Sequence, residues 1–199
     1  MVEDITWLGH ASFKIAGEKL IYIDPWKLGR GEPADIICIT HSHDDHCSPE
    51  DVAKIQKEGT VIVTVADCKD KLEGDVRVAR AGDSLKIEGV TIEAVPAYNI
   101  DKAFHPKANG WVGFIIEMGG SRIYHAGDTD LIPEMEEIKA DIALLPVGGT
   151  YTMTAEEAAQ AAARIKPKVA IPIHYCYIGG SQADAEKFKR LCGCEVRIL

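Results

Sequence analysis

Basic residues and long apolar runs are both scarce in this sequence. Its 199 residues contain 22 Lys and Arg against 31 Asp and Glu, which gives a formal net charge of -9 at pH 7. Proteins that bind the nucleic-acid backbone carry an excess of Lys and Arg over a whole face, so nucleic acid is not an expected partner. No run of about 18 apolar residues occurs, and the N-terminal residues lack the charged and apolar regions of a signal peptide. We therefore expect no membrane span and a soluble, cytoplasmic protein.

The CxxC pairs of structural zinc sites are also absent. The six cysteines are scattered along the chain, at Cys38, Cys47, Cys68, Cys176, Cys192 and Cys194. Without paired spacing they predict reduced, inert thiols rather than a cysteine-built zinc site. Cys38 lies in an apolar run and is interpreted as core. Cys47 and Cys176 lie close to candidate ligands, where a small side chain lining a loop is favoured over a thiolate ligand.

The sequence is instead rich in predicted strands. Its 46% hydrophobic content suffices for one core, so we expect a single domain over residues 1–199. Alternating and β-branched runs predict strands at 5–8, 12–15, 19–23, 60–66, 75–79, 84–87, 90–95, 111–117, 121–124, 141–146, 168–173 and 195–199. Helices are expected at about 49–57, 154–165 and 184–191. Because hairpins dominate over βα alternation, an α/β fold of the α+β type is favoured, with two mixed β-sheets packed together and helices outside.

Residues 40–46 read Thr-His-Ser-His-Asp-Asp-His and follow an apolar strand. They supply four potential metal ligands: His41, His43, Asp45 and His46. Side chains two apart in an extended chain point the same way about 6.6 Å apart, so His41 and His43 can converge on one ion. Asp45 and His46 lie past the bend and can face a second ion, as in hydrolytic sites with two metals about 3.5 to 4 Å apart. The alternative is a solvated polar loop, which the position between a strand end and a helix start disfavours.

Three further strand ends carry candidate ligands. Asp24 precedes Pro25, which holds it in an extended conformation suited to an acid that orients the ligands. Asp128 follows an apolar strand and a glycine, and its carboxylate either bridges two cations or serves only a turn. His174 ends a buried strand, where an imidazole either binds metal or is a hydrogen-bonded core histidine.

Together these residues make nearly the whole chain resemble the metallo-β-lactamase superfamily of metal-dependent hydrolases. The signature HxHxDH is matched by residues 41–46, and the family's first acidic motif, bridging acid and final histidine are resembled by Asp24, Asp128 and His174. The opening Trp-Leu-Gly-His-Ala-Ser-Phe and the segment His-Ala-Gly-Asp-Thr resemble the branch that contains ascorbate-6-phosphate lactonase-like proteins and the N-acyl phosphatidylethanolamine phospholipase D. The resemblance implies a four-layer αββα sandwich with a binuclear metal centre at one edge.

One histidine of the family, between the signature and the bridging acid, has no counterpart. Its place holds Asn99, which is a poor zinc ligand. Either the first metal has fewer protein ligands, or His105 or His125 substitutes. His105 is favoured because its irregular loop can fold over the site, whereas His125 lies three residues before Asp128 and faces the other way if the strand persists. The alternative for His105 is a surface histidine held by its own loop.

Three residues outside these motifs are also expected near the site. His10 follows a glycine between two apolar stretches, and we expect it to support a ligand or face the substrate, with a purely structural histidine as the alternative. Thr150 and Tyr151 follow two glycines that permit close backbone approach, and we expect them to face the substrate.

The expected cofactors are two divalent metal ions, with zinc favoured and manganese or iron as alternatives. Such ions lower the pKa of bound water from about 15.7 toward 7 and polarise a substrate oxygen. We therefore expect a hydrolase of an ester-like bond, a lactone or a phosphodiester, in a small soluble substrate. Asp45 is expected to orient the nucleophile, and His10 or His105 to stabilise the oxyanion or protonate the leaving group.

Two other activities fit the same scaffold. One is a mononuclear iron dioxygenase, whereas the diiron reductases resemble HxExDH and are disfavoured by His43. The other is a metal-stabilised binding module without turnover, which the missing histidine suggests. The sequence does not determine the oligomeric state, and a homo-oligomer is compatible with it.

Overall fold

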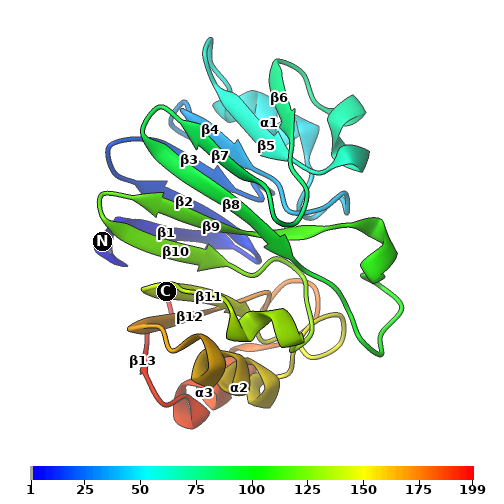
Figure 1. The fold of residues 1–199 in the computed structure, drawn as a ribbon, viewed down its shortest axis with the longest axis vertical. Coiled ribbons are helices and arrows are strands. Elements are labelled where there is room, and N and C mark those ends of the chain that lie inside the picture. Colours follow the sequence, from blue (N-terminus) through cyan, green and yellow to red (C-terminus); the bar gives the residue numbers. More distant parts are fainter. Residues whose placement is uncertain (1) are drawn as a thin grey trace.

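The computed structural model describes residues 2–199, which form two mixed β-sheets (Figure 1). The first sheet contains, in spatial order, β1 (Ile5–Gly9), β2 (Ser12–Ala16), β3 (Leu20–Ile23), β4 (Ile36–Cys38), β5 (Val61–Thr64) and β6 (Asp75–Val78). Strands β1 to β3 pair antiparallel, and β3 to β6 pair parallel. Strands β1, β3, β4, β5 and β6 therefore run in one direction and end at the same edge.

The second sheet has the order β13-β12-β11-β10-β9-β8-β7. Its strands are β7 (Ser84–Ile87), β8 (Val90–Pro96), β9 (Val112–Met118), β10 (Ser121–His125), β11 (Ile142–Pro146), β12 (Val169–Ile173) and β13 (Glu195–Val196). Strands β7 to β10 are antiparallel, and β10 to β13 are parallel. The carboxyl ends of β10, β11 and β12 thus share one edge of this sheet.

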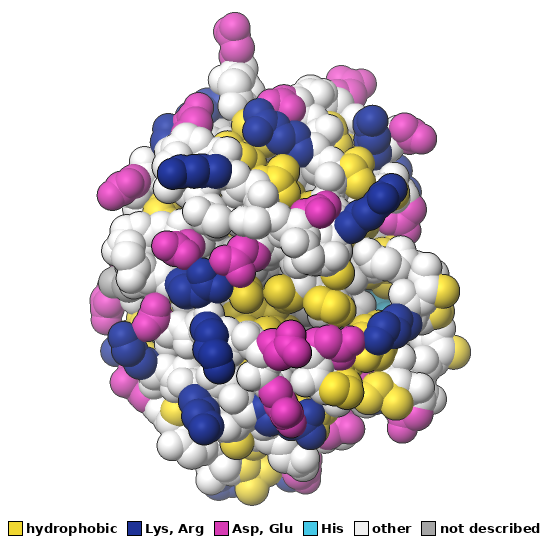
Figure 2. Space-filling view, in the orientation of Figure 1, with side chains coloured by type: hydrophobic (Ala, Val, Ile, Leu, Met, Phe, Trp, Pro, Cys, Tyr) yellow, Lys and Arg dark blue, Asp and Glu magenta, His cyan; other side chains and the backbone are white. Residues whose placement is uncertain are grey.

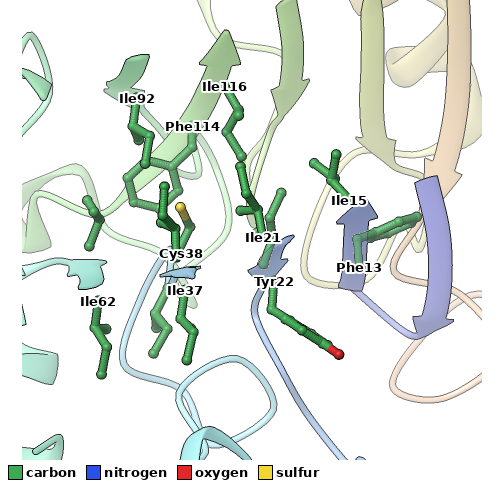
Figure 3. Packing of buried hydrophobic residues seen from close by; sticks show 14 of the residues in the cluster. Phe13, Ile15, Ile21, Tyr22, Ile37, Cys38, Ile62, Ile92, Phe114 and Ile116 are labelled. Carbon is green, nitrogen blue, oxygen red and sulfur yellow. The ribbon is translucent and has the colours of Figure 1, made fainter. Parts of the chain in front are cut away.

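The main apolar core lies between the two sheets. In Figure 3, Ile21 and Cys38 of the first sheet point toward Phe114 and Ile116 of the second, and all four side chains are fully buried. Strand alternation sends Ile115 to the opposite face of β9, where it joins a second apolar cluster. Burial on both faces explains why β9 reads as an almost continuous apolar run.

Helices cover the outer faces of the sheets. Helices α2 (Ala155–Ile165) and α3 (Gln182–Leu191) pack on the second sheet and on each other (Figure 1). Helix α1 (Pro49–Ile55) buries Val52 and Ile55, which belong to the same apolar cluster as the buried residues of the first sheet. Short 3-10 helices span Val2–Asp4, Ala66–Lys71, Lys107–Asn109 and Pro133–Glu136.

Local sequence signals explain where the helices begin. The Ser48 hydroxyl caps α1 by accepting a hydrogen bond from the Asp51 N–H, and Thr154 and Glu157 form a capping box at α2. Helix α3 begins at Gln182, two residues earlier than predicted, because Asp184 Oδ2 accepts a hydrogen bond from the Ser181 N–H (2.8 Å).

The predicted fold class, two mixed sheets with outer helices, is confirmed. The strands predicted at 60–66 and 195–199 are each three residues shorter in the structure, at Val61–Thr64 and Glu195–Val196. Across residues 2–199, every helix falls short of the length and apolarity that crossing a bilayer requires. On the face in Figure 2, Lys and Arg side chains are interspersed with Asp and Glu, and no broad basic surface is visible.

Candidate metal centre

The carboxyl ends of several strands deliver the candidate residues to one edge of the sandwich. His10 follows β1, Asp24 follows β3 and His174 follows β12, and all three have positive φ, at 54°, 45° and 58°. The prediction that Pro25 holds Asp24 in an extended conformation is therefore wrong. Such left-handed conformations are uncommon outside glycine and cost roughly 1–3 kcal/mol each. Strained backbone conformations of this kind cluster at functional sites. The three turns therefore mark this edge of the sandwich as a candidate functional site.

One group of ligands consists of His41, His43 and His105. Their ring nitrogens lie within 4.8 Å of one another, and His41 Nε2 is 3.1 Å from His43 Nδ1. The Trp111 ring lies beside them, with centroid distances of 4.9, 4.8 and 5.6 Å to the three imidazoles. Trp111 Nε1 donates a hydrogen bond to Asp67 (2.8 Å), which fixes this apolar wall. The loop after β4 and the loop between β8 and β9 thus meet at one possible ion position.

Asp128 joins this group to a second one, in which donor atoms of His10, Asp45, His46 and His174 lie within 4.8 Å of one another. Asp128 Oδ2 lies 3.2 Å from His105 Nε2 and 3.0 Å from His174 Nε2. Its other oxygen, Oδ1, lies 3.4 Å from His46 Nε2. The carboxylate therefore faces histidines of both groups.

Hydrogen bonds to Nδ1 of His41 and His46 determine which ring nitrogen of each faces the centre. Asp24 Oδ2 accepts hydrogen bonds from His46 Nδ1 (2.8 Å) and from the Thr40 hydroxyl (2.7 Å). Because the Thr40 proton goes to Asp24, Thr40 Oγ1 accepts from His41 Nδ1 (2.9 Å). In their neutral forms His41 and His46 then present an unprotonated Nε2 to the centre, the form that binds a metal.

His10 is fully buried and contacts Asp45, with 3.0 Å between Nε2 and Oδ2. Asp45 in turn reaches the cavity described below. His10 is not among the residues that line this cavity, so its contacts suit a residue that holds Asp45 in place.

The three alternatives for the missing histidine are separated by their contacts. His105 lies with His41 and His43, whereas Asn99 Oδ1 accepts hydrogen bonds from the His105 N–H (2.9 Å) and Nδ1 (3.0 Å). His125 donates from Nε2 to the Ala11 carbonyl (2.9 Å), and its Nδ1 accepts from the Gly127 N–H. Both ring nitrogens of His125 are therefore engaged away from the two groups.

Electrostatics at the centre are dominated by the buried acids. Burial disfavours the charged form of His46, but Asp128 and Asp24 outweigh this and raise its pKa well above the usual value. Burial likewise opposes ionisation of Asp128, but His174 and His46 hold its pKa well below the usual value. Burial raises the pKa of Asp45, but the hydrogen bond from His10 and the charges of His46 and His10 together outweigh this and lower the pKa to about 2. Both carboxylates are thus ionised at neutral pH and available to a cation.

The donor set fits divalent metal ions. His46 Nε2, His105 Nε2 and Asp128 Oδ1 are buried without a hydrogen-bond partner in the described chain. Buried polar atoms normally have partners, and these three converge on the same space. Imidazole nitrogens and carboxylate oxygens suit zinc, manganese or iron. Cations between the two groups would satisfy all three atoms.

A small cavity opens beside the ligands. It has a volume of about 140 Å³ and is lined by five candidate ligands and three apolar or aromatic residues: His43, Asp45, His105, Asp128, His174, Phe104, Tyr151 and Ile178. The Tyr151 ring is 4.6 Å from the Phe104 ring and 6.5 Å from that of His174. Of the two residues expected to face the substrate, Tyr151 lines the cavity, whereas Thr150 is exposed and does not.

Comparison with known proteins identifies the family. Residues 4–174 match the beta-lactamase superfamily domain. The chain belongs to this family. Its relatives include the UPF0173 metal-dependent hydrolases of Thermoplasma acidophilum, 38% identical over 95% of this chain and 90% of the relative, and of Thermococcus onnurineus, 36% identical over 98% and 94%.

Solved structures of the superfamily agree. A structure from Parabacteroides distasonis is similar with a TM-score of 0.88 and 36% identity, covering 98% of this chain and 91% of that one. Igni18, a metallo hydrolase from Ignicoccus hospitalis, has a TM-score of 0.76 and 28% identity over 98% and 94%. The predicted superfamily, and with it the class of metal-dependent hydrolase, is confirmed. The lactonase-like branch is not specified by these relatives and stays a prediction.

Several residues at the centre were not predicted from the sequence. Thr40 and Trp111 contact the ligands directly, and Asp130 holds the loop that carries His105 through a hydrogen bond from Asn99 Nδ2 (3.1 Å). Thr40 adjoins the first ligand, which is the one local signal available. Trp111 and Asp130 lie far from the motif in sequence and reach the site only through the fold.

Proposed function

We propose that this metallo-β-lactamase superfamily hydrolase cleaves an ester-like bond, in a lactone or a phosphodiester, of a small soluble molecule at a two-metal centre. The observation that carries the proposal is the place of Asp128 between two groups of ligands. His41, His43 and His105 would hold one ion, and Asp45, His46 and His174 the other, with Asp128 shared. Zinc is the favoured metal because the donors are mostly imidazole.

The chemistry available follows from this donor set. Divalent cations there would lower the pKa of water in the site from about 15.7 toward 7 and polarise the oxygen of the scissile bond. Asp45 has a carboxylate oxygen fixed by His10 and reaches the cavity, so it can accept a hydrogen bond from the attacking water and orient it. Phe104 and Ile178 line the same small space and make part of its wall apolar.

The arrangement of His105 weakens the case for a binding module without turnover. That alternative arose because the family's histidine is missing at Asn99. His105 lies within 4.8 Å of the donors of His41 and His43, so three imidazoles are available on that side.

Hydrolysis of a panel of lactones and aryl phosphodiesters by zinc-loaded protein tests the proposal. Elemental analysis should give two equivalents of metal. His43→Ala should lose activity by more than about 100-fold, because removing a residue that only supports a ligand already costs 10- to 100-fold. The matched control is His125→Gln, which changes a buried histidine outside both groups and should retain activity and metal content.

Intact activity in His43→Ala would refute the two-metal assignment. Oxygen consumption with a thiol substrate by iron-loaded protein, without hydrolysis of any ester, would support the iron dioxygenase instead.

A further inference from the structure

Most of the exposed large apolar side chains of the described chain lie in two loops that also line the cavity. There are six: Ile100, Phe104, Tyr177, Ile178, Leu191 and Leu199. Two of them lie in the loop between β8 and β9, and two in the loop between β12 and α3. Single exposed apolar residues are ordinary, but a group around one cavity indicates a binding surface. We call Ile100, Phe104, Tyr177 and Ile178 the apolar rim.

Contacts with the protein hold part of the rim in place. Phe104 packs edge-on against Tyr151, with 4.6 Å between ring centroids. The Tyr177 ring lies 6.0 Å from that of Trp26 and 6.3 Å from that of His10. Phe104 and Ile178 also line the cavity itself, together with five of the candidate ligands. The rim is thus continuous with the space in which the reaction would occur.

The lysine side chains near the rim interact with other residues of the protein. Lys102 Nζ donates to Asp130 Oδ1 (2.5 Å), and Lys107 pairs with Glu134 (3.0 Å). Lys27 lies over the Trp26 ring, 4.1 Å from its centroid. The cavity lining contains no Lys or Arg. The mouth therefore offers apolar surface rather than a site for a second charged group of the substrate.

The cavity is small compared with ordinary substrate-binding sites. Its volume of about 140 Å³ is well below the roughly 300–1,000 Å³ of ordinary small-molecule sites. A cavity this small suits the reacting ester group, and the remainder of a larger substrate would lie across the mouth.

We propose that the apolar rim binds an aliphatic or aromatic substituent of the substrate, so that the preferred substrate is a lactone or ester with an apolar group next to the scissile bond. This inference rests on the proposed function. The substituent is preferred over a protein partner as occupant because the rim continues into the catalytic cavity and two of its members line both.

A homologous series of lactones tests the proposal. Zinc-loaded protein is assayed with γ-butyrolactone and its γ-alkyl derivatives from methyl to hexyl. Each methylene placed on the rim should raise kcat/KM about three- to fourfold, until the rim is covered. In Phe104→Ala and Ile178→Ala the slope of log kcat/KM against chain length should fall by at least half.

The control variant is Leu191→Ala, which removes an equally exposed leucine from the end of α3, outside the rim. It should keep the wild-type slope. A flat or falling series in the wild type, with γ-butyrolactone still hydrolysed, would overturn the rim while leaving the proposed function intact.

Binding gives a second measurement that does not require turnover. The corresponding γ-alkyl lactams are titrated by calorimetry into zinc-loaded wild type, Phe104→Ala and Leu191→Ala. Affinity that rises with chain length in wild type and Leu191→Ala but not in Phe104→Ala, with a negative heat-capacity change, supports the rim even if no lactone is hydrolysed. An affinity that does not depend on chain length overturns the proposal. A wild-type dimer that dissociates in Phe104→Ala also overturns it, because the rim would then bind a second copy of the chain.

Discussion

Asn99 Oδ1 accepts two hydrogen bonds from His105, one from its backbone N–H (2.9 Å) and one from its ring Nδ1 (3.0 Å). The amide nitrogen of Asn99 donates to Asp130 Oδ1 (3.1 Å) and to the Tyr151 carbonyl (2.9 Å). Both ends of the amide are thus assigned by their partners, and His105 Nδ1 must carry the proton. His105 Nε2 is left unprotonated when the ring is neutral and faces Asp128. The residue at the place of the family's histidine therefore positions His105, the histidine that we propose replaces it.

Asn99→Ala should weaken metal binding at the site of His41, His43 and His105 by about 10- to 100-fold, the usual cost of losing a group that orients a ligand. Competition with a chromophoric chelator measures the affinity. Asn99→Asp should not restore the affinity, because a carboxylate oxygen in place of the donor Nδ2 would face the Asp130 carboxylate and the Tyr151 carbonyl. Wild-type affinity in Asn99→Ala would show that His105 is held by its loop alone.

His10→Ala should lower kcat by about 10- to 100-fold with little change in metal content, because Asp45 loses the hydrogen bond that fixes its carboxylate. Steady-state kinetics and elemental analysis give the two readouts. His10→Gln should recover part of kcat, since its side-chain amide can donate to the same oxygen. Equal losses in the two variants would point to a packing role for His10.

Gly148→Ala should destabilise the protein by about 1–3 kcal/mol and displace His174, a cost typical of overpacking. A Cβ at Gly148 would lie 2.6 Å from the His174 carbonyl oxygen and 3.0 Å from its Nδ1. Urea unfolding and metal content measure the two effects. Gly29→Ala is the matched control, because an added Cβ there meets nothing within 4 Å, and its effect should stay within about 0.5 kcal/mol.

Asp51→Asn should destabilise the protein by about 1–3 kcal/mol at pH 7, because the buried carboxylate accepts hydrogen bonds from the Lys27 and Leu28 N–H groups (2.8 and 2.9 Å). Burial raises the Asp51 pKa, but bonds from Lys54 and Ser48 outweigh this and hold the pKa below its usual value. A lowered pKa stabilises the fold above the unfolded value of about 3.9 and loses this effect as pH falls through the folded value. Urea unfolding from pH 7 to pH 3 should show the difference between the two proteins shrinking below pH 4, and a constant difference would contradict it.

Chelation of metal should lower Tm, because ions that bind only the folded protein stabilise it by about 2.7 kcal/mol at 100 times Kd. Calorimetry with and without chelator, followed by zinc addition, measures the shift and its reversal. Asp128→Asn should reduce the shift, since its carboxylate faces ligands of both groups. A Tm independent of chelator would argue against metal at this centre.

Local signals accounted for most of the secondary structure. An almost continuous apolar run located β9. Strand alternation predicted that His125 would face away from the centre, and the structure gives it the Ala11 carbonyl as a partner. Capping at Ser48 and Thr154 located two helix starts. Element boundaries were less accurate where a side-chain contact sets them, as at Ser181 before α3.

The sequence by itself determined that a strand end carries His41, His43, Asp45 and His46, because residues this close in the chain are held together by local geometry. Only the tertiary structure decided which distant groups join them. His105 reaches His41 through a loop fastened by Asn99 to Asp130, 31 residues away, and no local pattern encodes that contact. The apolar rim likewise exists only because two loops from different parts of the second sheet end beside the same cavity.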